Sequence, residues 1–220
     1  FMHQSVQNLT DIENKIKSNL NNLNIKELPK IIAVSKTFSI DKIQPLINHG
    51  HLHFGENKVQ EAIEKWSDIK KNSPEIQLHM IGKLQSNKVK FAIKLFDFIH
   101  SVDNKKLMKK ISDEQKKLNK KIQVFLQVNI GNEPQKSGIE EDNIQDFINY
   151  SEELNLNLLG LMCIPPADKD PIIFFEKMNT LNKKFGFKEL SMGMSSDYLK
   201  AVENFSTYLR IGSSIFGQRY

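Results

Sequence analysis

The chain has 220 residues, of which 39% are hydrophobic, and this length and composition predict a single domain that spans residues 1–220. It has no apolar run near the roughly 20 residues that cross a bilayer, no signal-peptide core and one cysteine, Cys163, so we expect a cytoplasmic protein without a membrane partner. The net charge is +5, but the lysines are dispersed and their densest run, 104–121, lacks aromatic residues that could stack on bases, so we expect no nucleic-acid partner.

From residue 31 onward, short apolar runs alternate with longer segments whose apolar residues recur three or four positions apart. A first helix, at about 3–23, precedes these runs and is expected to pack outside the first strand. The predicted strands span 31–34, 51–54, 77–81, 98–102, 123–130, 158–164, 189–192 and 207–211. The helices between them span 40–48, 57–70, 87–95, 105–118, 141–154, 171–185 and 197–204, and a short helix follows the last strand. Pro45 predicts a kink or a late start in the helix at 40–48.

Strands that alternate with helices indicate a parallel sheet, and eight such units favour an α/β fold of the closed (β/α)8 type, a TIM barrel. A doubly wound open sheet satisfies the same alternation and is the alternative. In a barrel, the residues that directly follow the strands gather at one face, which is where the sites of barrel enzymes lie. Candidate site residues are therefore sought directly after each predicted strand.

Two of these loops, "GMSSD" at 193–197 and "RIGSS" at 210–214, have the composition of an anion-binding site. Glycine allows the backbone to approach closely, serine hydroxyls donate hydrogen bonds, and each loop leads into a helix N-terminus. Either loop alone is more typical of helix capping. Together, on adjacent strands, they predict a phosphate site.

Two cations are expected at the same mouth. Lys36 follows the first strand, and Arg210 lies near the end of the last, which is beside the first in a closed barrel. A lysine in this place can bind phosphate, form an ion pair or form a Schiff base, and the position alone does not decide among these roles.

The sequence contains no clear metal or nucleophile motif. His79, Glu56, Asp103 and Asp197 do not form a clustered ligand set, so we expect no metal site. His79 alternates with apolar neighbours in a strand, which is typical of a hydrogen-bonded core histidine. The chain has no GxSxG, Walker A or GxGxxG motif.

A set of motifs in order along the chain resembles one known family. These are "AVSKT" at 33–37, "FGENKVQEA" at 54–62, "HMIGKLQSNK" at 79–88, "KSGI" at 136–139, "GLMCIPP" at 160–166, "LSMGMSSD" at 190–197 and "YLRIGSSIFGQR" at 208–219. They are similar to the YggS/PROSC family of pyridoxal phosphate homeostasis proteins. Phe205 departs from the pattern, because family members often carry glycine there.

The resemblance implies a lone barrel of the alanine racemase N-terminal-domain type that holds pyridoxal 5′-phosphate (PLP) as an internal aldimine. It implies that Lys36 is the PLP lysine and that Ser195, Ser196, Gly212 and Ser213 hold the phosphate. It also implies that Arg210 faces the pyridine nitrogen and that Asn57 lies near the cofactor.

We therefore expect an intracellular PLP carrier or homeostasis protein, without catalytic residues or efficient catalysis of its own. Racemases of this fold use a second domain that supplies a tyrosine base, whereas this chain ends after its eighth strand. A weak amino-acid racemase or other PLP-dependent enzyme is the first alternative, and a barrel that binds another phosphorylated metabolite is the second. Apo-PLP enzymes are the expected recipients of PLP, and the protein is expected to be a monomer.

Overall fold

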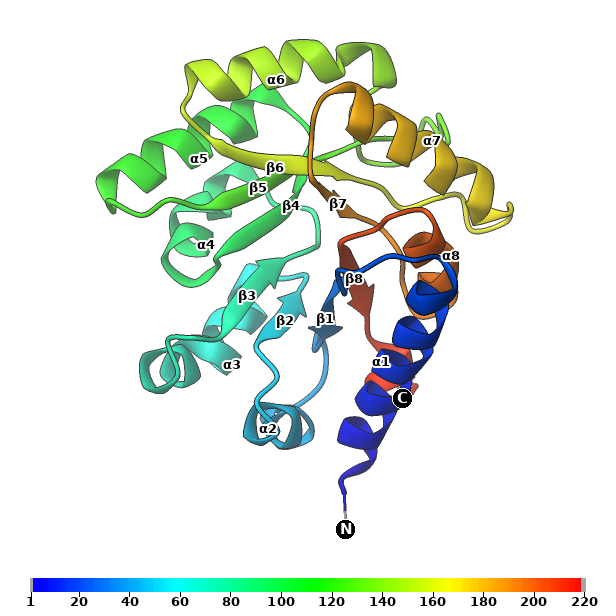
Figure 1. The fold of residues 1–220 in the computed structure, drawn as a ribbon. Coiled ribbons are helices and arrows are strands. Elements are labelled where there is room, and N and C mark those ends of the chain that lie inside the picture. Colours follow the sequence, from blue (N-terminus) through cyan, green and yellow to red (C-terminus); the bar gives the residue numbers. More distant parts are fainter. Residues whose placement is uncertain (1, 219–220) are drawn as a thin grey trace.

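Eight parallel strands close into a barrel that helices surround (Figure 1). The computed structural model describes residues 2–218. The strands are β1 (Lys30–Val34), β2 (His53–Glu56), β3 (Gln77–Met80), β4 (Phe98–Val102), β5 (Gln123–Gln127), β6 (Asn157–Met162), β7 (Glu189–Ser191) and β8 (Tyr208–Ile211). The predicted barrel is confirmed. The open-sheet alternative is wrong, because β1 pairs with β8 in the register Ile32 to Arg210 and Ala33 to Ile211.

The predicted helices are also present, with ends that shift by a few residues. They are α1 (Gln4–Asn22), α2 (Ile40–Asn48), α3 (Val59–Asn72), α4 (Val89–Leu95), α5 (Lys105–Lys117), α6 (Ile144–Glu153), α7 (Pro171–Lys184), α8 (Tyr198–Glu203) and α9 (Ser213–Phe216). The 3-10 helices η1 (Ser86–Lys88) and η2 (Glu141–Asn143) precede α4 and α6. Pro45 lies inside α2, which begins at Ile40, so the proline does not delay the helix.

The N-terminal helix α1 covers the outside of the barrel where β8 meets β1, and it packs against α2, α8 and α9 (Figure 1). Its buried residues recur at helical spacing, from Val6 through Leu9 and Ile16 to Leu20. Asn8 also donates a hydrogen bond to the Ile215 carbonyl, 2.8 Å away. The helix thus joins the beginning of the described chain to its end.

The strands divide their side chains between two cores. In β8, Leu209 and Ile211 point outward into the core shared with the helices, whereas Tyr208 points into the barrel. The interior cluster contains Ile32, Phe98, Phe125, Met162 and Tyr208. By the same alternation, Arg210 points into the barrel above Tyr208.

The barrel interior also holds buried histidines. His79 is 2.9 Å from His53 and 2.8 Å from His100, measured between ring nitrogens. Its ring stacks on Phe98, with 4.1 Å between centroids. The prediction that His79 is a hydrogen-bonded core histidine is confirmed. Burial lowers the pKa of His51 and of His53 to about 4, and lowers the pKa of His79 and His100 well below the ordinary value.

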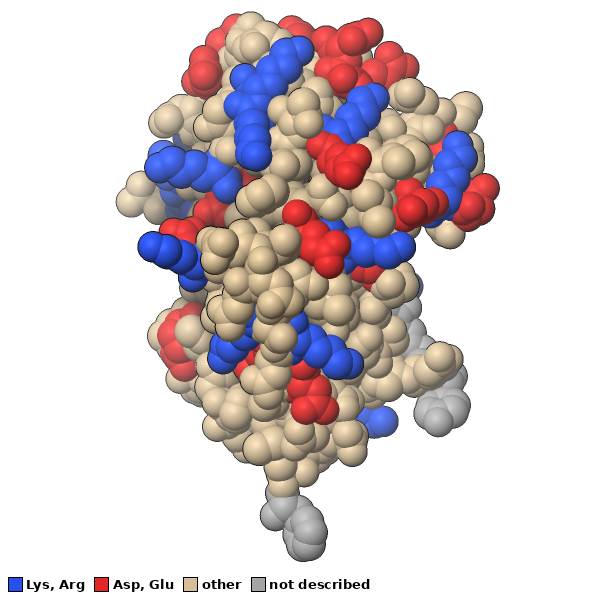
Figure 2. Space-filling model, turned by 45° about the vertical axis from the view of Figure 1, so that its right-hand side comes forward, with Lys and Arg blue, Asp and Glu red and all other residues tan. Residues whose placement is uncertain are grey.

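Charged groups are mixed on the surface. Figure 2 shows basic and acidic side chains intermingled on the visible face. In the lysine-rich helix α5, Lys109 pairs with Asp113 at 2.6 Å, and Lys110 pairs with Glu114 at 3.1 Å. No helix within residues 2–218 is long and apolar enough to cross a bilayer.

Because these histidines are buried in the neutral form, we expect the free energy of unfolding to fall as the pH is lowered. Unfolding restores their ordinary pKa of 6.5, so below that pH the unfolded chain binds protons that the folded chain excludes. The free energy of unfolding should be constant above about pH 6.5 and should fall toward pH 4 by up to about 1.4 kcal/mol per pH unit for each such histidine. Urea unfolding across this range measures it.

Two variants test whether the buried histidines cause the dependence of the free energy of unfolding on pH. His53→Asn should reduce it, whereas His49→Asn, at an exposed position, should leave it unchanged. A free energy of unfolding that stays flat between about pH 7 and about pH 5 would contradict the prediction.

Candidate functional site

A cavity of about 650 Å³ opens at the C-terminal ends of the strands. Five of the seven residues predicted for the site line it, namely Lys36, Asn57, Arg210, Gly212 and Ser213. They come from the loops or ends of β1, β2 and β8, which neighbour one another in the closed sheet. The cavity therefore has a primary amine, a guanidinium, an amide and a glycine–serine turn on one wall.

Lys36 lies two residues beyond β1, in the turn that leads to α2, and is half-buried. Gly212 directly follows β8 and passes close to β1. A Cβ at Gly212 would lie 3.3 Å from both the Cβ and the carbonyl oxygen of Val34, so a larger residue would crowd this approach. The glycine thus allows the turn after β8 to lie close to the strand that precedes Lys36.

The other two predicted residues, Ser195 and Ser196, do not line the cavity. The Ser195 hydroxyl accepts a hydrogen bond from the backbone N–H of Ser214, at 3.1 Å, and so joins the loop after β7 to the loop after β8. Ser196 is exposed. Asp197 accepts a hydrogen bond from the Met194 N–H at 2.7 Å and closes the loop before α8. The two loops therefore meet as predicted, and Ser195 forms their junction.

Arg210 is a buried cation with neutral acceptors. It is 4% exposed, its Nη1 donates to the Ser191 hydroxyl at 2.6 Å, and its Nη2 donates to the Cys163 carbonyl at 2.9 Å. Burial lowers the pKa of Arg210 from its very high ordinary value, and an arginine still keeps its charge at neutral pH. Burial raises the pKa of the Cys163 thiol to about 12, so that thiol is uncharged.

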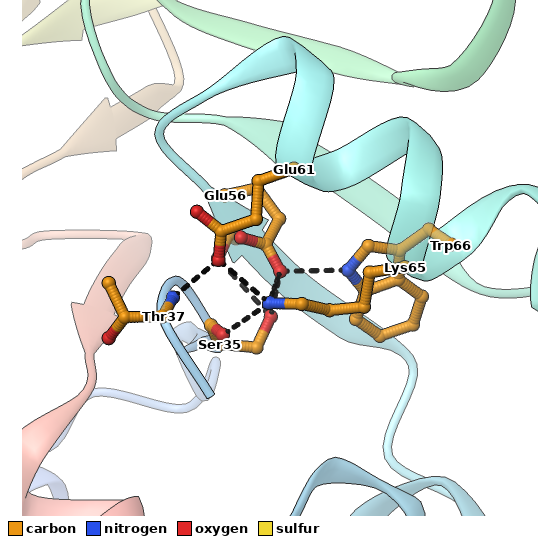
Figure 3. Close-up of polar contacts among 7 residues, drawn as sticks. Ser35, Thr37, Glu56, Glu61, Lys65 and Trp66 are labelled. Atoms are coloured by element: carbon orange, nitrogen blue, oxygen red, sulfur yellow. Dashed lines mark hydrogen bonds and ion pairs between the residues drawn. The ribbon is translucent and has the colours of Figure 1, made fainter. Parts of the chain in front are cut away.

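A buried ionic cluster lies next to the Lys36 turn (Figure 3). Glu56, at the end of β2, is completely buried. Its Oε1 accepts hydrogen bonds from the Ser35 hydroxyl at 2.9 Å, from Lys65 Nζ at 2.8 Å and from the Trp66 indole at 2.9 Å. Glu61 supplies a second carboxylate to Lys65, 3.1 Å away. These residues form the Glu56–Lys65–Glu61 cluster.

This cluster holds both neighbours of Lys36. Lys65 donates to the Ser35 carbonyl at 2.8 Å, and the Thr37 N–H donates to Glu61 at 2.5 Å (Figure 3). Thr37 has φ of +68°, a left-handed conformation that non-glycine residues adopt only when surrounding contacts hold it. The backbone on each side of Lys36 is therefore fixed by α3 and β2.

The sequence predictions missed one cavity residue with a clear signal. Gln127 lines the cavity and is the last residue of β5. The predicted strand at 123–130 continued past it. Phe125 points into the barrel, so a period of two places Gln127 inside as well, at the mouth. Lys83 also lines the cavity, although sequence reasoning gave it no role.

Within residues 2–218, no three His, Cys, Asp or Glu side chains form a potential metal site.

Comparison with known proteins identifies the family. The alanine racemase N-terminal domain profile matches residues 12–220. A pyridoxal phosphate homeostasis protein of Aquifex aeolicus is 36% identical over 200 residues, which cover 86% of this chain and 87% of the relative. One of Vibrio alginolyticus is 37% identical over 204 residues, covering 88% of each. The chain belongs to the pyridoxal phosphate homeostasis protein family.

Solved structures agree with this assignment. PipY of Synechococcus elongatus, solved with PLP bound, is 32% identical and superimposes with a TM-score of 0.79 over 92% of this chain and 100% of PipY. An alanine racemase of Clostridium difficile is 17% identical, with a TM-score of 0.70 over 94% of this chain and 57% of the racemase. That likeness shows the shared fold, the predicted alanine racemase N-terminal-domain type of barrel.

The Glu56–Lys65–Glu61 cluster predicts a large stability loss when it is broken. Glu56→Ala should lower the free energy of unfolding by about 3–5 kcal/mol, because it leaves buried donors of Lys65, Trp66 and Ser35 without their acceptor. Urea unfolding measures the change. As a control, Asp68→Ala removes the exposed ion pair with Lys71 and should cost no more than about 1 kcal/mol. Equal, small effects of both variants would contradict the prediction.

Proposed function

We propose that this protein binds PLP in the cavity at the C-terminal end of the barrel and acts in PLP homeostasis as a carrier. The observation that supports this most is that an amine, Lys36, and a buried guanidinium, Arg210, line one cavity. Relatives that match over most of their length are named pyridoxal phosphate homeostasis proteins, and PipY was solved with PLP bound.

The residues present fit this cofactor. PLP supplies an aldehyde that condenses with primary amines, a pyridine ring that withdraws electrons, and a phosphate. In this proposal Lys36 binds the aldehyde and Arg210 faces the pyridine nitrogen. Gly212 and Ser213 hold the phosphate, together with the adjoining Ser195 and Ser196, and Asn57 contacts the cofactor from the end of β2.

The guanidinium of Arg210 argues for carriage rather than catalysis. A cation opposite the pyridine nitrogen disfavours protonation of the ring, which makes the ring a weaker electron sink. The guanidinium is fixed in place by Ser191 and by the Cys163 carbonyl. A weak amino-acid racemase or another PLP-dependent enzyme remains the second candidate, supported by the fold shared with alanine racemase.

We further propose that the protein acts in the cytoplasm as a monomer and passes PLP to apo-PLP enzymes. The exposed apolar side chains include Phe91 in α4, Ile173 in α7 and Phe205 beyond the end of α8, and their spread over separate parts of the chain supports a monomer. The name of the relatives, pyridoxal phosphate homeostasis proteins, supports transfer to another protein.

Lys36 is predicted to be the covalent attachment point. Lys36→Ala should abolish the visible absorbance of the PLP-loaded protein and the pyridoxyl group that borohydride fixes, because in the proposal Lys36 is the amine that binds the aldehyde. Peptide mapping of the reduced wild-type protein reads out the site. Lys83→Ala is the matched control, since Lys83 lines the same cavity, and it should keep the label. A label on Lys83 or Lys136 would refute the assignment.

The carrier and enzyme candidates differ in turnover. We expect negligible exchange of the α-proton of L- or D-alanine and measurable transfer of PLP to an added apo-PLP enzyme, because Arg210 weakens the electron sink. Deuterium exchange at the α-carbon measures the first, and recovery of acceptor activity against a free-PLP control measures the second. Robust racemisation that Lys36→Ala abolishes would overturn the carrier proposal in favour of the enzyme.

A further inference from the structure

A continuous chain of hydrogen bonds crosses the barrel interior and ends on Arg210. His53 Nδ1 lies 2.9 Å from His79 Nε2, and His79 Nδ1 lies 2.8 Å from His100 Nε2. His100 Nδ1 lies 2.8 Å from the Ser191 hydroxyl, which accepts from Arg210 Nη1 at 2.6 Å. The five side chains come from β2, β3, β4, β7 and β8, so the chain joins opposite parts of the sheet. We call it the histidine chain.

The histidine chain is buried and packed on aromatic rings. His79, His100 and Ser191 are completely buried. The His100 ring stacks on Phe125 at 4.5 Å between centroids, and Tyr208 lies against both His79 and His100. Only His53, at the start of β2, is partly exposed.

Burial, together with nearby positive charges, keeps these rings neutral. Burial lowers the pKa of all three histidines, and the Arg210 guanidinium lowers the pKa of His100 further. Lys30 and His51 also disfavour a proton on His53 and His79, while Asp97 is the carboxylate that favours one on His53. A neutral imidazole has one donor nitrogen and one acceptor nitrogen, so each ring passes a hydrogen bond in one direction.

The direction follows from Arg210. A guanidinium only donates, so the Ser191 oxygen is its acceptor and the Ser191 hydrogen is free to go to His100 Nδ1. His100 then carries its hydrogen on Nε2 and donates to His79 Nδ1, and His79 donates to His53 in the same way. In the reverse direction Ser191 would accept from both sides, and its own hydrogen would have no acceptor among residues 2–218.

We propose that Ser191, His100, His79 and His53 are positioning residues that hold Arg210 through one polarised chain of Nε2–H tautomers. Every lone pair in this chain points toward the guanidinium and every hydrogen points away, so the aligned dipoles stabilise a buried cation whose two direct partners are neutral. Asp197 is the carboxylate that acts on Arg210, and it is not one of these partners. The consequence for the cofactor rests on the proposed function, in which Arg210 faces the PLP ring.

The tautomers can be measured without PLP. Nitrogen NMR of the full chain labelled at its histidine rings distinguishes Nε2–H, Nδ1–H and imidazolium forms, with assignment by single His→Asn variants. At neutral pH we expect His53, His79 and His100 to be neutral Nε2–H tautomers. An Nδ1–H or imidazolium form of His79 or His100 overturns the proposal, whether or not the protein binds PLP.

A second experiment tests the link to the cofactor. Ser191→Ala removes the junction between His100 and Arg210. It should raise the PLP dissociation constant at least about tenfold and should change the pH dependence of the visible spectrum of bound PLP. Ser191→Thr retains a hydroxyl and should restore both properties. Ser206→Ala is the matched control, because its buried hydroxyl also lies near β7 and β8 but donates to the Met192 carbonyl, outside the chain.

The outcomes separate the two proposals. A spectrum and affinity unchanged in Ser191→Ala, or changed equally in Ser206→Ala, overturn the positioning role. If the wild-type protein binds no PLP at all, the proposed function fails, and the NMR tautomers still decide whether the polarised chain exists.

Discussion

Pairing of β1 with β8 is the constraint on which the site depends. Parallel strands present their C-terminal ends at one edge, and closure turns that edge into a ring. The first strand, which leads to Lys36, thereby lies beside the last, which carries Arg210 and leads to Gly212. The cavity wall is built from opposite ends of the chain, and α1 packs over the same junction through α8 and α9. Contacts that keep the barrel closed therefore also keep the two cations together.

Each cation is supported by its own buried polar network. The Glu56–Lys65–Glu61 cluster holds the backbone on both sides of Lys36. Ser191, backed by the three histidines of the histidine chain, holds Arg210. Burying such groups is costly unless their partners are well placed. Glu56 Oε1 collects three donors, although the buried Oε2 has no hydrogen-bond partner among the described residues. Both networks lie next to the cavity. There they hold the backbone around Lys36 and the guanidinium of Arg210 in one arrangement, which offsets the cost of burying charged groups.

The local pattern of the sequence predicted the fold and the face of the site, because strand and helix periodicities are local and strand ends converge in any closed parallel barrel. The same pattern could not predict the role of Lys65. In the sequence it is an ordinary helix lysine, and only tertiary packing places it beside Glu56. His100 was overlooked because its link to Ser191 joins residues 91 positions apart. Phe205, at a position where the family resemblance led us to expect glycine, has φ of +65°, a backbone conformation that favours glycine.

In the proposed function, Lys36 and Arg210 act on different parts of the same cofactor. An amine at Lys36 makes retention covalent but reversible, which suits a protein that must both hold and release PLP. A guanidinium at Arg210 discourages the ring protonation that amino-acid chemistry exploits. A carboxylate in that place would favour the protonated ring and thereby promote reaction at a bound amine. The direct partners of Arg210, the Ser191 hydroxyl and the Cys163 carbonyl, are neutral, so no direct contact neutralises its charge, and in this proposal that charge acts on the ring. In this proposal, carriage without turnover follows from the charge of Arg210 and from the contacts that hold it in place.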